Sequence, residues 1–511
     1  MIVRVFSAAL QGVDATEVEI EVHEAQGSPQ MIIVGLPDTA VRESRDRVLT
    51  AIGNSGFLKA EGRTTVNLAP ADLKKEGPSF DLPIALGCIA HSERFKDGAL
   101  ESAAVVGELS LDGRVRPVKG VLSIAQEAKR AGRKAILVPE ENVLEACLVD
   151  GLYVYGVADL RAAVDLLCGE SGRKPQRIDR EAFFNSNRRY EIDFSEVKGQ
   201  AHVKRALEVA VAGNHNVLML GPPGTGKSMI AKRIATIMPL MSEEEAIETT
   251  KIHSIAGLLE PDQSFLATRP FRSPHHTISD AGLLGGSNHP RPGEVSLAHN
   301  GILFLDELPE FRRSTLEVMR QPLEDGRVTV SRASGTLTFP SDFMLVAAMN
   351  PCKCGYFGDP KRDCRCSPSE VQKYRQRISG PLLDRIDLHL EVPAIDYKEL
   401  SAKAEGEPSE AIRARVQAAR ELQAERYALA GSTNTNSTMA PKLVSKHCQL
   451  DAEGGGLLEQ AMAELNLSAR AHDRILKVSR TLADLDGADQ IQADHVLEAI
   501  QYRTLDRNLW G

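Results

Sequence analysis

The stretch Asn216-Val-Leu-Met-Leu-Gly-Pro-Pro-Gly-Thr-Gly-Lys-Ser228 decides how the central part of this chain folds. Its first five residues form an apolar strand, and the rest fits GxxxxGK[ST], a loop whose backbone N–H groups surround phosphates. A helix is expected to begin near Met229. We predict that Lys227 contacts the β- and γ-phosphates of ATP and that the Ser228 hydroxyl binds Mg²⁺. The other residues of the predicted phosphate loop are Gly221, Pro222, Pro223, Gly224, Thr225 and Gly226.

Two carboxylates follow a second apolar strand, Ile302 to Leu305. P-loop ATPases place a metal-binding carboxylate at such a strand end, and a second carboxylate there is positioned to activate water. We predict that Asp306 binds Mg²⁺ through a water molecule and that Glu307 orients and deprotonates the attacking water. Strands ending in two carboxylates are common in structural roles, but the preceding phosphate loop favours catalysis. A third strand, Met344 to Ala348, leads to Asn350, whose amide is expected to sense the γ-phosphate.

The rest of the chain is organised around these strands. Strand-like and helical stretches alternate through residues 190–400, which predicts a parallel sheet covered by helices. Residues 401–511 show only helical patterns, apart from a polar stretch at 431–438 that predicts a flexible loop. Residues 1–168 predict a separate α/β domain, and residues 169–189 predict an exposed linker. The expected fold class is a multidomain α/β protein with a P-loop core and a helical C-terminal lid.

The composition restricts the class of protein. Hydrophobic residues make up 42% and charged residues 26% of the 511, as in globular proteins. No run approaches the ~18 apolar residues that span a bilayer, and Arg4 interrupts the first apolar stretch, so we expect a cytoplasmic protein with no membrane partner. The net charge of −9 means that any contact with a polyanion depends on local basic loops.

Half of the eight cysteines fall in the window 352–366: Cys352, Cys354, Cys364 and Cys366. Four thiolates are enough for a closed tetrahedral Zn²⁺ site. Only one residue separates the members of each pair, whereas structural zinc sites usually have about two to four. The alternatives are a zinc ion that braces the loop beside Asn350 and a metal-free loop of reduced thiols, and the clustering favours zinc.

Four further stretches carry a family resemblance. They are Phe271-Arg-Ser-Pro-His-His-Thr277, Gly282-Leu-Leu-Gly-Gly286, Pro290-Arg-Pro-Gly-Glu-Val-Ser-Leu-Ala-His-Asn-Gly301 and Ile378-Ser-Gly-Pro-Leu-Leu-Asp-Arg-Ile-Asp-Leu388. With the nucleotide motifs, which resemble those of AAA+ ATPases, they resemble the Mg-chelatase-like ATPase family known as YifB or ComM. The resemblance spans essentially the whole chain.

The resemblance implies a hexameric ring. It places Arg385 at the arginine-finger position, acting on the nucleotide of the neighbouring subunit, and Arg470 at the sensor position of the helical lid. A guanidinium suits both roles because a transferring phosphoryl group spreads negative charge over its oxygens. Without the family context, each arginine is an ordinary candidate for a surface ion pair.

The predicted hairpin from Arg327 to Phe339, with its turn at Ala333 to Gly335, corresponds to a hairpin that enters the central pore in related ring ATPases. Arg332 near this turn and Arg291 within residues 285–294 are therefore candidates for contact with a DNA backbone. The alternative for each is a solvated arginine without a partner.

The N-terminal domain resembles another family in Glu76-Gly-Pro-Ser79, Gly107 to Val118 and Ala135 to Asn142. These stretches resemble the proteolytic domain of Lon, an S5-like α/β fold, and Ser79 lies at its nucleophile position. That family uses a lysine as the base, but Ile124 stands at this position here, and an apolar side chain cannot accept a proton. We expect the Lon-protease-like fold without proteolysis.

The sequence is compatible with three functions. The YifB/ComM resemblance implies an ATP-driven motor on single-stranded or branched DNA, for branch migration of recombination intermediates in natural transformation, with recombination proteins as further partners. The second is the motor subunit of a magnesium chelatase, which remodels a protein partner. We expect no Lon-like domain on that motor, which favours the first. The third, an ATP-dependent protease, is weakened by Ile124.

Overall fold

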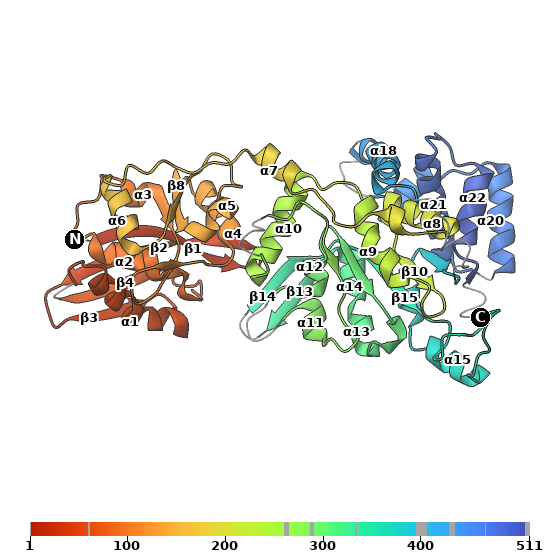
Figure 1. The fold of residues 1–511 in the computed structure, drawn as a ribbon, viewed down its shortest axis with the longest axis horizontal. Coiled ribbons are helices and arrows are strands. Elements are labelled where there is room, and N and C mark those ends of the chain that lie inside the picture. Colours follow the sequence, from red (N-terminus) through yellow and green to blue (C-terminus); the bar gives the residue numbers. More distant parts are fainter. Residues whose placement is uncertain are drawn as a thin grey trace. The chain divides into compact units, whose positions relative to one another are not determined.

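The computed structural model describes residues 2–59, 62–259, 265–286, 291–332, 335–394, 406–428, 435–465 and 467–505. The chain forms two compact units (Figure 1). Unit 1 consists of Met1–Asn187 and Glu243–Ala267, and unit 2 consists of Arg188–Ser242 and Thr268–Gly511. Residues 243–267, which we expected within the ATPase core, therefore group with the N-terminal part of the chain.

Unit 1 is built on a seven-stranded mixed sheet. In spatial order its strands are β3 Gln30–Val34, β4 Arg63–Ala69, β2 Asp14–Ala25, β1 Ile2–Gln11, β5 Ala103–Val105, β8 Ala135–Pro139 and β9 Tyr153–Val157. Apolar residues and glutamates alternate at residues 17–22, as expected for a strand with one buried face. Val18, Ile20 and Val22 are fully buried in the core, and the glutamates between them are partly exposed. A small ribbon joins β6 Glu108–Leu109 and β7 Val115–Arg116.

Unit 1 also contains helices. They are α1 Thr39–Asn54, α2 Asp81–Ile89, α3 Ala99–Ser102, α4 Val121–Arg130, α5 Val143–Ala146, α6 Leu160–Cys168, α7 Arg180–Ser186 and α10 Glu243–Ala256, with short 3₁₀ turns at Pro78–Phe80 and Glu140–Asn142. Helix α10 provides a hydrogen-bond partner at the start of α4, where the cap residue Gly120 has no side chain. The Gly120 N–H donates to the Ser254 hydroxyl of α10 at 2.8 Å. Ser254 also hydrogen-bonds the Glu145 carboxylate.

The stretch that we expected to be an exposed linker contains packed structure. Gln176 pairs with Val154 on the edge of β9, and α7 follows within the same unit. The ring of Phe184 lies 5.5 Å from that of Phe265, between centroids. A helix of only two turns is too short to show a clear helical period, which explains why the sequence pattern did not reveal it.

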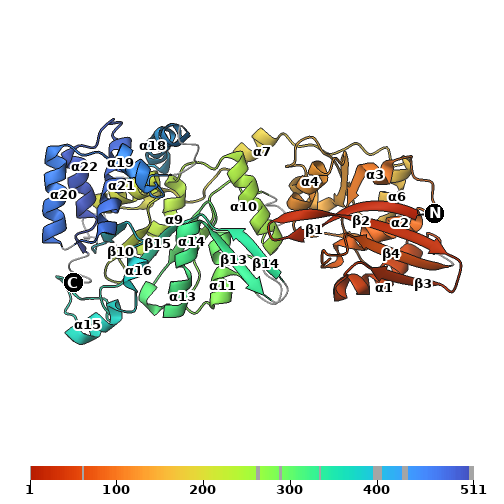
Figure 2. The ribbon, with the colours of Figure 1, turned by 180° about the vertical axis from the view of Figure 1, so that it is seen from behind.

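Unit 2 contains a five-stranded parallel sheet. In spatial order its strands are β11 Phe271–Arg272, β12 Ile302–Leu305, β15 Met344–Met349, β10 Val217–Leu220 and β16 Leu388–Glu391. The predicted strands at 216–220, 301–305 and 344–348 are thus present as neighbours near the middle of one sheet. Figure 2 labels two of them, β10 and β15. Because every strand runs in the same direction, the loops that follow β10, β12 and β15 emerge at the same edge.

Helices accompany this sheet along the chain. They are α8 Ala201–Gly213, α9 Lys227–Ile237, α11 Asp280–Leu284, α12 Glu294–Leu297, α13 Arg313–Val318, α14 Arg320–Asp325, α15 Pro368–Arg375 and α16 Gly380–Leu383, with 3₁₀ turns at Phe194–Glu196 and Leu308–Glu310. The expected hairpin forms from β13 Arg327–Arg332 and β14 Gly335–Pro340, which pair antiparallel. Its turn at residues 333–334 and the side chain of Arg332 lie outside the described part.

The described residues after 405 are helical. Their helices are α18 Ser409–Ala428, α19 Pro441–His447, α20 Ala452–Glu464, α21 Ala469–Leu485 and α22 Ala493–Gln501. Helix α18 packs on α8 and α9, so these helices and the sheet share one hydrophobic core. Within the described ranges, no helix has both the length and the apolar composition needed to cross a membrane.

We expected a flexible loop at residues 431–438. In its described part, residues 435–438, the structure instead shows a buried and hydrogen-bonded asparagine. Asn436 is fully buried, and its side chain accepts a hydrogen bond from the Tyr427 hydroxyl at 2.6 Å and donates to Asp484 at 2.8 Å. Its backbone N–H donates to Gln423 at 3.0 Å. A polar composition predicted a loop, but these polar side chains instead satisfy one another inside the helical region.

Candidate nucleotide-binding site

The sheet topology brings the predicted nucleotide residues together. Strand β15 lies between β10 and β12, so Asn350 is placed between the phosphate loop and the carboxylates Asp306 and Glu307. The Lys227 ammonium donates to the side-chain oxygen of Asn350 at 3.2 Å, and the Ser228 hydroxyl donates to Asp306 at 2.6 Å. Residues from three separate strand ends therefore form one polar cluster.

The loop before α9 has the conformation of an anion cradle. Gly224 and Gly226 have φ values of +81° and +85°, which glycine adopts without steric cost. Gly226 is the cap residue of α9 and has no side chain, so the first N–H groups of the helix face the loop without a side-chain cap. Lys227 donates to the carbonyl oxygens of Gly221 at 2.7 Å and Pro222 at 2.9 Å, which holds the ammonium inside the loop.

The donor set suits Mg²⁺. Ser228 and Asp306 present two oxygen ligands side by side, and magnesium prefers oxygen ligands. The backbone N–H of Glu307 donates to the second Asp306 oxygen at 2.9 Å, which orients the carboxylate. Glu307 itself has a φ of +53°, which is uncommon outside glycine and directs the chain sharply away from β12.

Burial lowers the pKa of Lys227 to about 8, against the opposing effect of Asp306. Below this pKa the free protein presents an ammonium to the phosphates, and above it a neutral amine. We therefore expect the ATP affinity to be constant below about pH 8 and to fall by up to roughly tenfold per pH unit above it.

Bound triphosphate favours the ammonium, so its pKa rises and binding above about pH 8 takes up a proton. Calorimetric titration with ATP in buffers of different ionisation enthalpy measures this uptake. An ATP affinity that stays constant to about pH 9.5, with no proton uptake, would contradict this role of Lys227.

The two arginines predicted to act on the nucleotide each have an acidic partner within unit 2. Arg385 forms an ion pair with Glu324 of α14. Its backbone carbonyl accepts a hydrogen bond from the Asn216 side chain at 2.9 Å. Arg470, at the start of α21, lies 3.1 Å from the Asp384 carboxylate and is mostly exposed. Arg385 therefore lies within the segment 384–387 that leads into β16, and Arg470 contacts the first residue of this segment.

The two candidate DNA contacts differ in what the structure describes. Arg291 is exposed, and its carbonyl oxygen accepts the Gly286 N–H at 3.1 Å. Gly285 also pairs with Pro292, so the described residues on either side of 287–290 lie together. For Arg332 only the backbone is described, and it pairs with Gly335 across the hairpin.

Sequence reasoning missed three residues that support this site. The Gln200 amide donates to the carbonyl of Thr225 in the phosphate loop at 3.3 Å. Asn216 accepts the Leu345 N–H at 2.8 Å, which joins β10 to β15. His276 lies 3.3 Å from the Glu307 carboxylate. Asn216 could have been singled out because it is a polar residue directly before an apolar strand. His276 could have been singled out because it belongs to a pair of adjacent histidines, His275 and His276.

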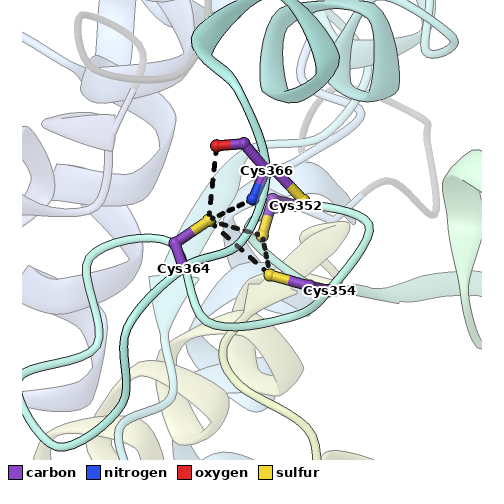
Figure 3. Close-up of side chains that lie close together, drawn as sticks. All are labelled: Cys352, Cys354, Cys364 and Cys366. Atoms are coloured by element: carbon purple, nitrogen blue, oxygen red, sulfur yellow. Dashed lines mark hydrogen bonds between the residues drawn. The ribbon is translucent and has the colours of Figure 1, made fainter.

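The four clustered cysteines meet in space (Figure 3). The Cys352 sulfur is 3.3 Å from that of Cys354 and 3.6 Å from that of Cys364, and all four sulfurs lie within 4.8 Å of one another. A tetrahedron with Zn–S bonds of about 2.3 Å has sulfurs roughly 3.8 Å apart, so the spacing fits. Backbone N–H groups of Tyr356 and Arg365 lower the pKa of Cys354 to about 6, which favours a thiolate ligand.

The cysteine loop touches the phosphate loop. Gly355, with a φ of +89°, approaches Pro223 so closely that an added Cβ would lie 2.6 Å from the proline ring. The loop starts directly after Asn350, and Arg375 of α15 donates to the Pro351 carbonyl at 3.2 Å. A metal at the cysteines would therefore fix a loop that packs on the predicted phosphate loop.

Three family models match the chain. Residues 193–400 match the model described as magnesium chelatase, subunit ChlI, residues 20–142 match subunit ChlI of Mg-chelatase, and residues 406–503 match magnesium chelatase, subunit ChlI C-terminal. The second match corrects one expectation. A model named for a chelatase subunit covers most of the N-terminal domain, so the presence of this domain does not by itself separate a DNA motor from a chelatase motor.

Individual relatives give the extent of the similarity. Competence protein ComM of Haemophilus influenzae is 43% identical over 510 residues, which cover 99% of this chain and 98% of that protein. YifB of Escherichia coli is 43% identical over 507 residues, covering 99% and 97%. The magnesium-chelatase 38 kDa subunit of Rhodobacter capsulatus is 27% identical over 177 residues, covering 31% of this chain and 50% of that protein.

Proposed function

This chain belongs to the YifB/ComM family of magnesium-chelatase-like AAA+ proteins, and from that premise we propose that it is a hexameric, ATP-driven motor that branch-migrates recombination intermediates. The family implies ATP and Mg²⁺ as ligands. One observation supports the proposal most: similarity to a competence protein covers 99% of this chain, including the phosphate loop and both carboxylates.

Hydrolysis is assigned to the clustered residues. Lys227 and the first amides of α9 bind the triphosphate, and Ser228 and Asp306 supply oxygen ligands for Mg²⁺. The metal, when bound, neutralises charge on the phosphates. Glu307 accepts the proton of the attacking water.

The two arginines and Asn350 complete the assignment. Arg385 stabilises the charge of the transferring phosphoryl group in the neighbouring subunit, after exchanging its ion pair with Glu324. Asn350 and Arg470 sense the γ-phosphate from the sheet and from the helical lid. A finger that acts across an interface requires a closed assembly, and the proposed assembly is a hexamer.

DNA is proposed as the substrate that the motor moves along. The chain carries a net charge of −9, so affinity for DNA has to come from a few arginines repeated by symmetry. We assign these contacts to Arg332 on the β13–β14 hairpin and to exposed Arg291. The proposed partners are single-stranded or branched DNA and recombination proteins.

The chelatase-type motor remains the second candidate. The names of the matched family models favour it, whereas the extent of similarity favours the DNA motor: the similarity to the chelatase subunit covers 31% of this chain and that to ComM covers 99%. The proposed N-terminal domain is a Lon-like fold without proteolysis. Ile124, at the position of the lysine base, is buried in α4.

DNA is expected to stimulate ATP hydrolysis. The experiment measures ATP turnover and DNA binding with single-stranded and branched DNA over a series of salt concentrations. Binding should weaken steeply as salt rises, because it rests on phosphate contacts. Arg332→Ala should weaken binding to all sequences alike and retain basal turnover.

Lys442→Ala is the control, because it removes an exposed charge from α19 outside the proposed contacts. DNA binding that neither depends on salt nor changes in Arg332→Ala would refute the assigned contact. Absence of any DNA binding would favour the chelatase-type motor.

The cysteine cluster is proposed to bind structural zinc. Protein purified without chelators should contain about one zinc per chain, and replacing Cys364 and Cys366 together with serine should release it. The matched control replaces Cys88 and Cys168, which lie in unit 1 outside the cluster. Metal analysis by mass spectrometry decides the outcome, and a zinc content near zero in the unchanged protein would favour the reduced loop.

A further inference from the structure

A fully buried histidine contacts the finger segment, residues 384–387, which carries Arg385. His215 lies between α8 and β10, and its Nδ1 atom is 2.9 Å from a carboxylate oxygen of Asp387. Asp387 stands two residues after Arg385 and directly before β16. The other ring nitrogen of the histidine, Nε2, lies 2.8 Å from the Thr481 hydroxyl of α21. The ring therefore joins the finger segment to the helical C-terminal region.

The end of α8 fixes the place of this ring. Asn214 adopts the left-handed conformation that ends the helix, with a φ of +60°, and the His215 N–H donates to the Ala210 carbonyl at 2.8 Å. Gly213 leaves room for the ring, because an added Cβ there would lie 2.2 Å from Nε2 of His215. The helix end and the missing side chain thus hold the imidazole beside Asp387.

The contact between His215 and Asp387 is a hydrogen bond to a charged group. Burial acts to raise the pKa of Asp387, but Arg474 and His215 outweigh this effect and lower the pKa to about 2. Asp387 is therefore ionised at neutral pH. An ionised carboxylate only accepts hydrogen bonds, so Nδ1 of His215 carries the proton between them. Arg474 of α21 donates to the other carboxylate oxygen of Asp387.

The backbone of the finger segment is also held at several points. The Asn216 side chain donates to the Arg385 carbonyl at 2.9 Å, and Arg503 donates to the Ile386 carbonyl at 2.7 Å. The Asp387 N–H donates to the Asn216 carbonyl at 2.9 Å. The main chain that carries the Arg385 side chain is therefore fixed both at the sheet and at the helical region.

This arrangement bears on catalysis because the reach of an arginine finger depends on where its backbone lies. Misplacing a catalytic group by about 1 Å can cost roughly 100-fold in rate. We infer that His215 is a positioning residue that sets the place of Arg385 through Asp387 and thereby supports hydrolysis in the neighbouring subunit. The inference rests on the proposed function of Arg385 as a finger. His215 precedes β10, whereas the phosphate loop follows the end of this strand, so we assign the histidine no part in ATP binding by its own subunit.

Variants of the full-length protein test the positioning role. His215→Ala should lower kcat for ATP hydrolysis roughly 10- to 100-fold, which is less than Arg385→Ala because Arg474 still holds Asp387. The affinity for an ATP analogue should not change. His215→Asn places an amide N–H where Nδ1 lies and should restore most of the turnover. The amide of His215→Gln replaces Nε2 instead, so this variant should stay slow.

Mixed rings show in which subunit the defect acts. His215→Ala subunits keep an intact phosphate loop, and Lys227→Ala subunits keep an intact finger segment. Mixing the two should therefore give more activity than the average of the separate variants. Mixing His215→Ala with Arg385→Ala should give no more than that average, because neither subunit supplies a well-placed finger. A histidine with only a structural role would not produce this difference between the two mixtures.

His495→Ala is the matched control. His495 is also a buried histidine of unit 2, but its ring contacts Asp486 at 3.2 Å and the Gln492 N–H at 3.0 Å, at the start of α22. Its replacement should leave turnover unchanged. Oligomer size and binding of the ATP analogue show that each variant is folded and assembled. If His215→Ala does not assemble, His215→Gln takes its place in the same mixtures.

The finger and its positioning fail in different ways. If Lys227→Ala does not restore Arg385→Ala, the finger assignment falls and the positioning role falls with it. If it restores Arg385→Ala but not His215→Ala, only the positioning role is overturned. Two other results would also overturn it: turnover of assembled His215→Ala and His215→Gln equal to that of the unchanged protein, or recovery of His215→Ala by Arg385→Ala.

Discussion

Lys227→Ala is expected to weaken nucleotide binding by orders of magnitude, whereas Glu307→Gln should bind ATP normally and fail to hydrolyse it. Lys227 is mostly buried and donates to the loop carbonyls and to Asn350, so its removal leaves the cradle without its positive charge. The expected loss of affinity is roughly two to three orders of magnitude, from the ~2–5 kcal/mol that removal of one partner of a buried charge pair costs. Titration with a fluorescent ATP analogue measures it.

Glu307→Gln tests the proposed role of Glu307 as the base that deprotonates water. Asp306, the proposed metal ligand, and its contact with Ser228 survive this change, but the amide cannot accept a proton, so kcat should fall by roughly 10²–10⁴. Lys232→Ala is the matched control, because it removes an exposed ammonium from the same helix as Lys227 and should alter neither property. Equal losses of ATP affinity in Lys227→Ala and Glu307→Gln would remove this division of roles.

Arg385→Ala is expected to bind ATP and, if Arg385 is the proposed finger, to lose turnover by roughly three orders of magnitude or more, the contribution typical of arginine fingers. Mixing it with Lys227→Ala subunits should restore part of the activity. Some interfaces in a mixed ring then combine an intact phosphate loop with an intact finger from its neighbour. Steady-state ATPase assays over a series of mixing ratios measure the recovery.

The ion pair with Glu324 supplies the control for Arg385. If the arginine served only that ion pair, Glu324→Gln would cost as much activity as Arg385→Ala. If it is a finger, Glu324→Gln should retain turnover, because the guanidinium remains. Inactivity at every mixing ratio, in rings proven to contain both subunits, would exclude action across the interface.

The nucleotide cluster was predictable because its signals are local. Each strand is an apolar run that ends in a polar residue, and parallel strands place these ends at one edge. The family resemblance added Arg385 and Arg470, which periodicity alone does not distinguish from surface residues. Their acidic partners, Glu324 and Asp384, come from tertiary contacts that no sequence pattern encodes.

The failures of prediction have a common cause. Helix α10 lies within the sequence expected for the ATPase core, and its own pattern does not reveal that Ser254 caps α4 of unit 1. Asn436 has the composition of a loop, yet it is buried through hydrogen bonds to residues on α18 and α21. His276 belongs to a family motif, but its contact with Glu307 depends on the neighbouring strands β11 and β12. In each case the partner is distant in sequence, so only the fold reveals the role.

Conversion of a four-way DNA junction is the measurement that tests the central claim most directly. Gel analysis follows conversion of the labelled junction to its forked products, with ATP or a non-hydrolysable analogue. We predict conversion by the unchanged protein with ATP, and none with the analogue or with Glu307→Gln. An assembled, ATPase-active ring that neither binds nor remodels any DNA would contradict the account and make the chelatase-type motor the leading candidate.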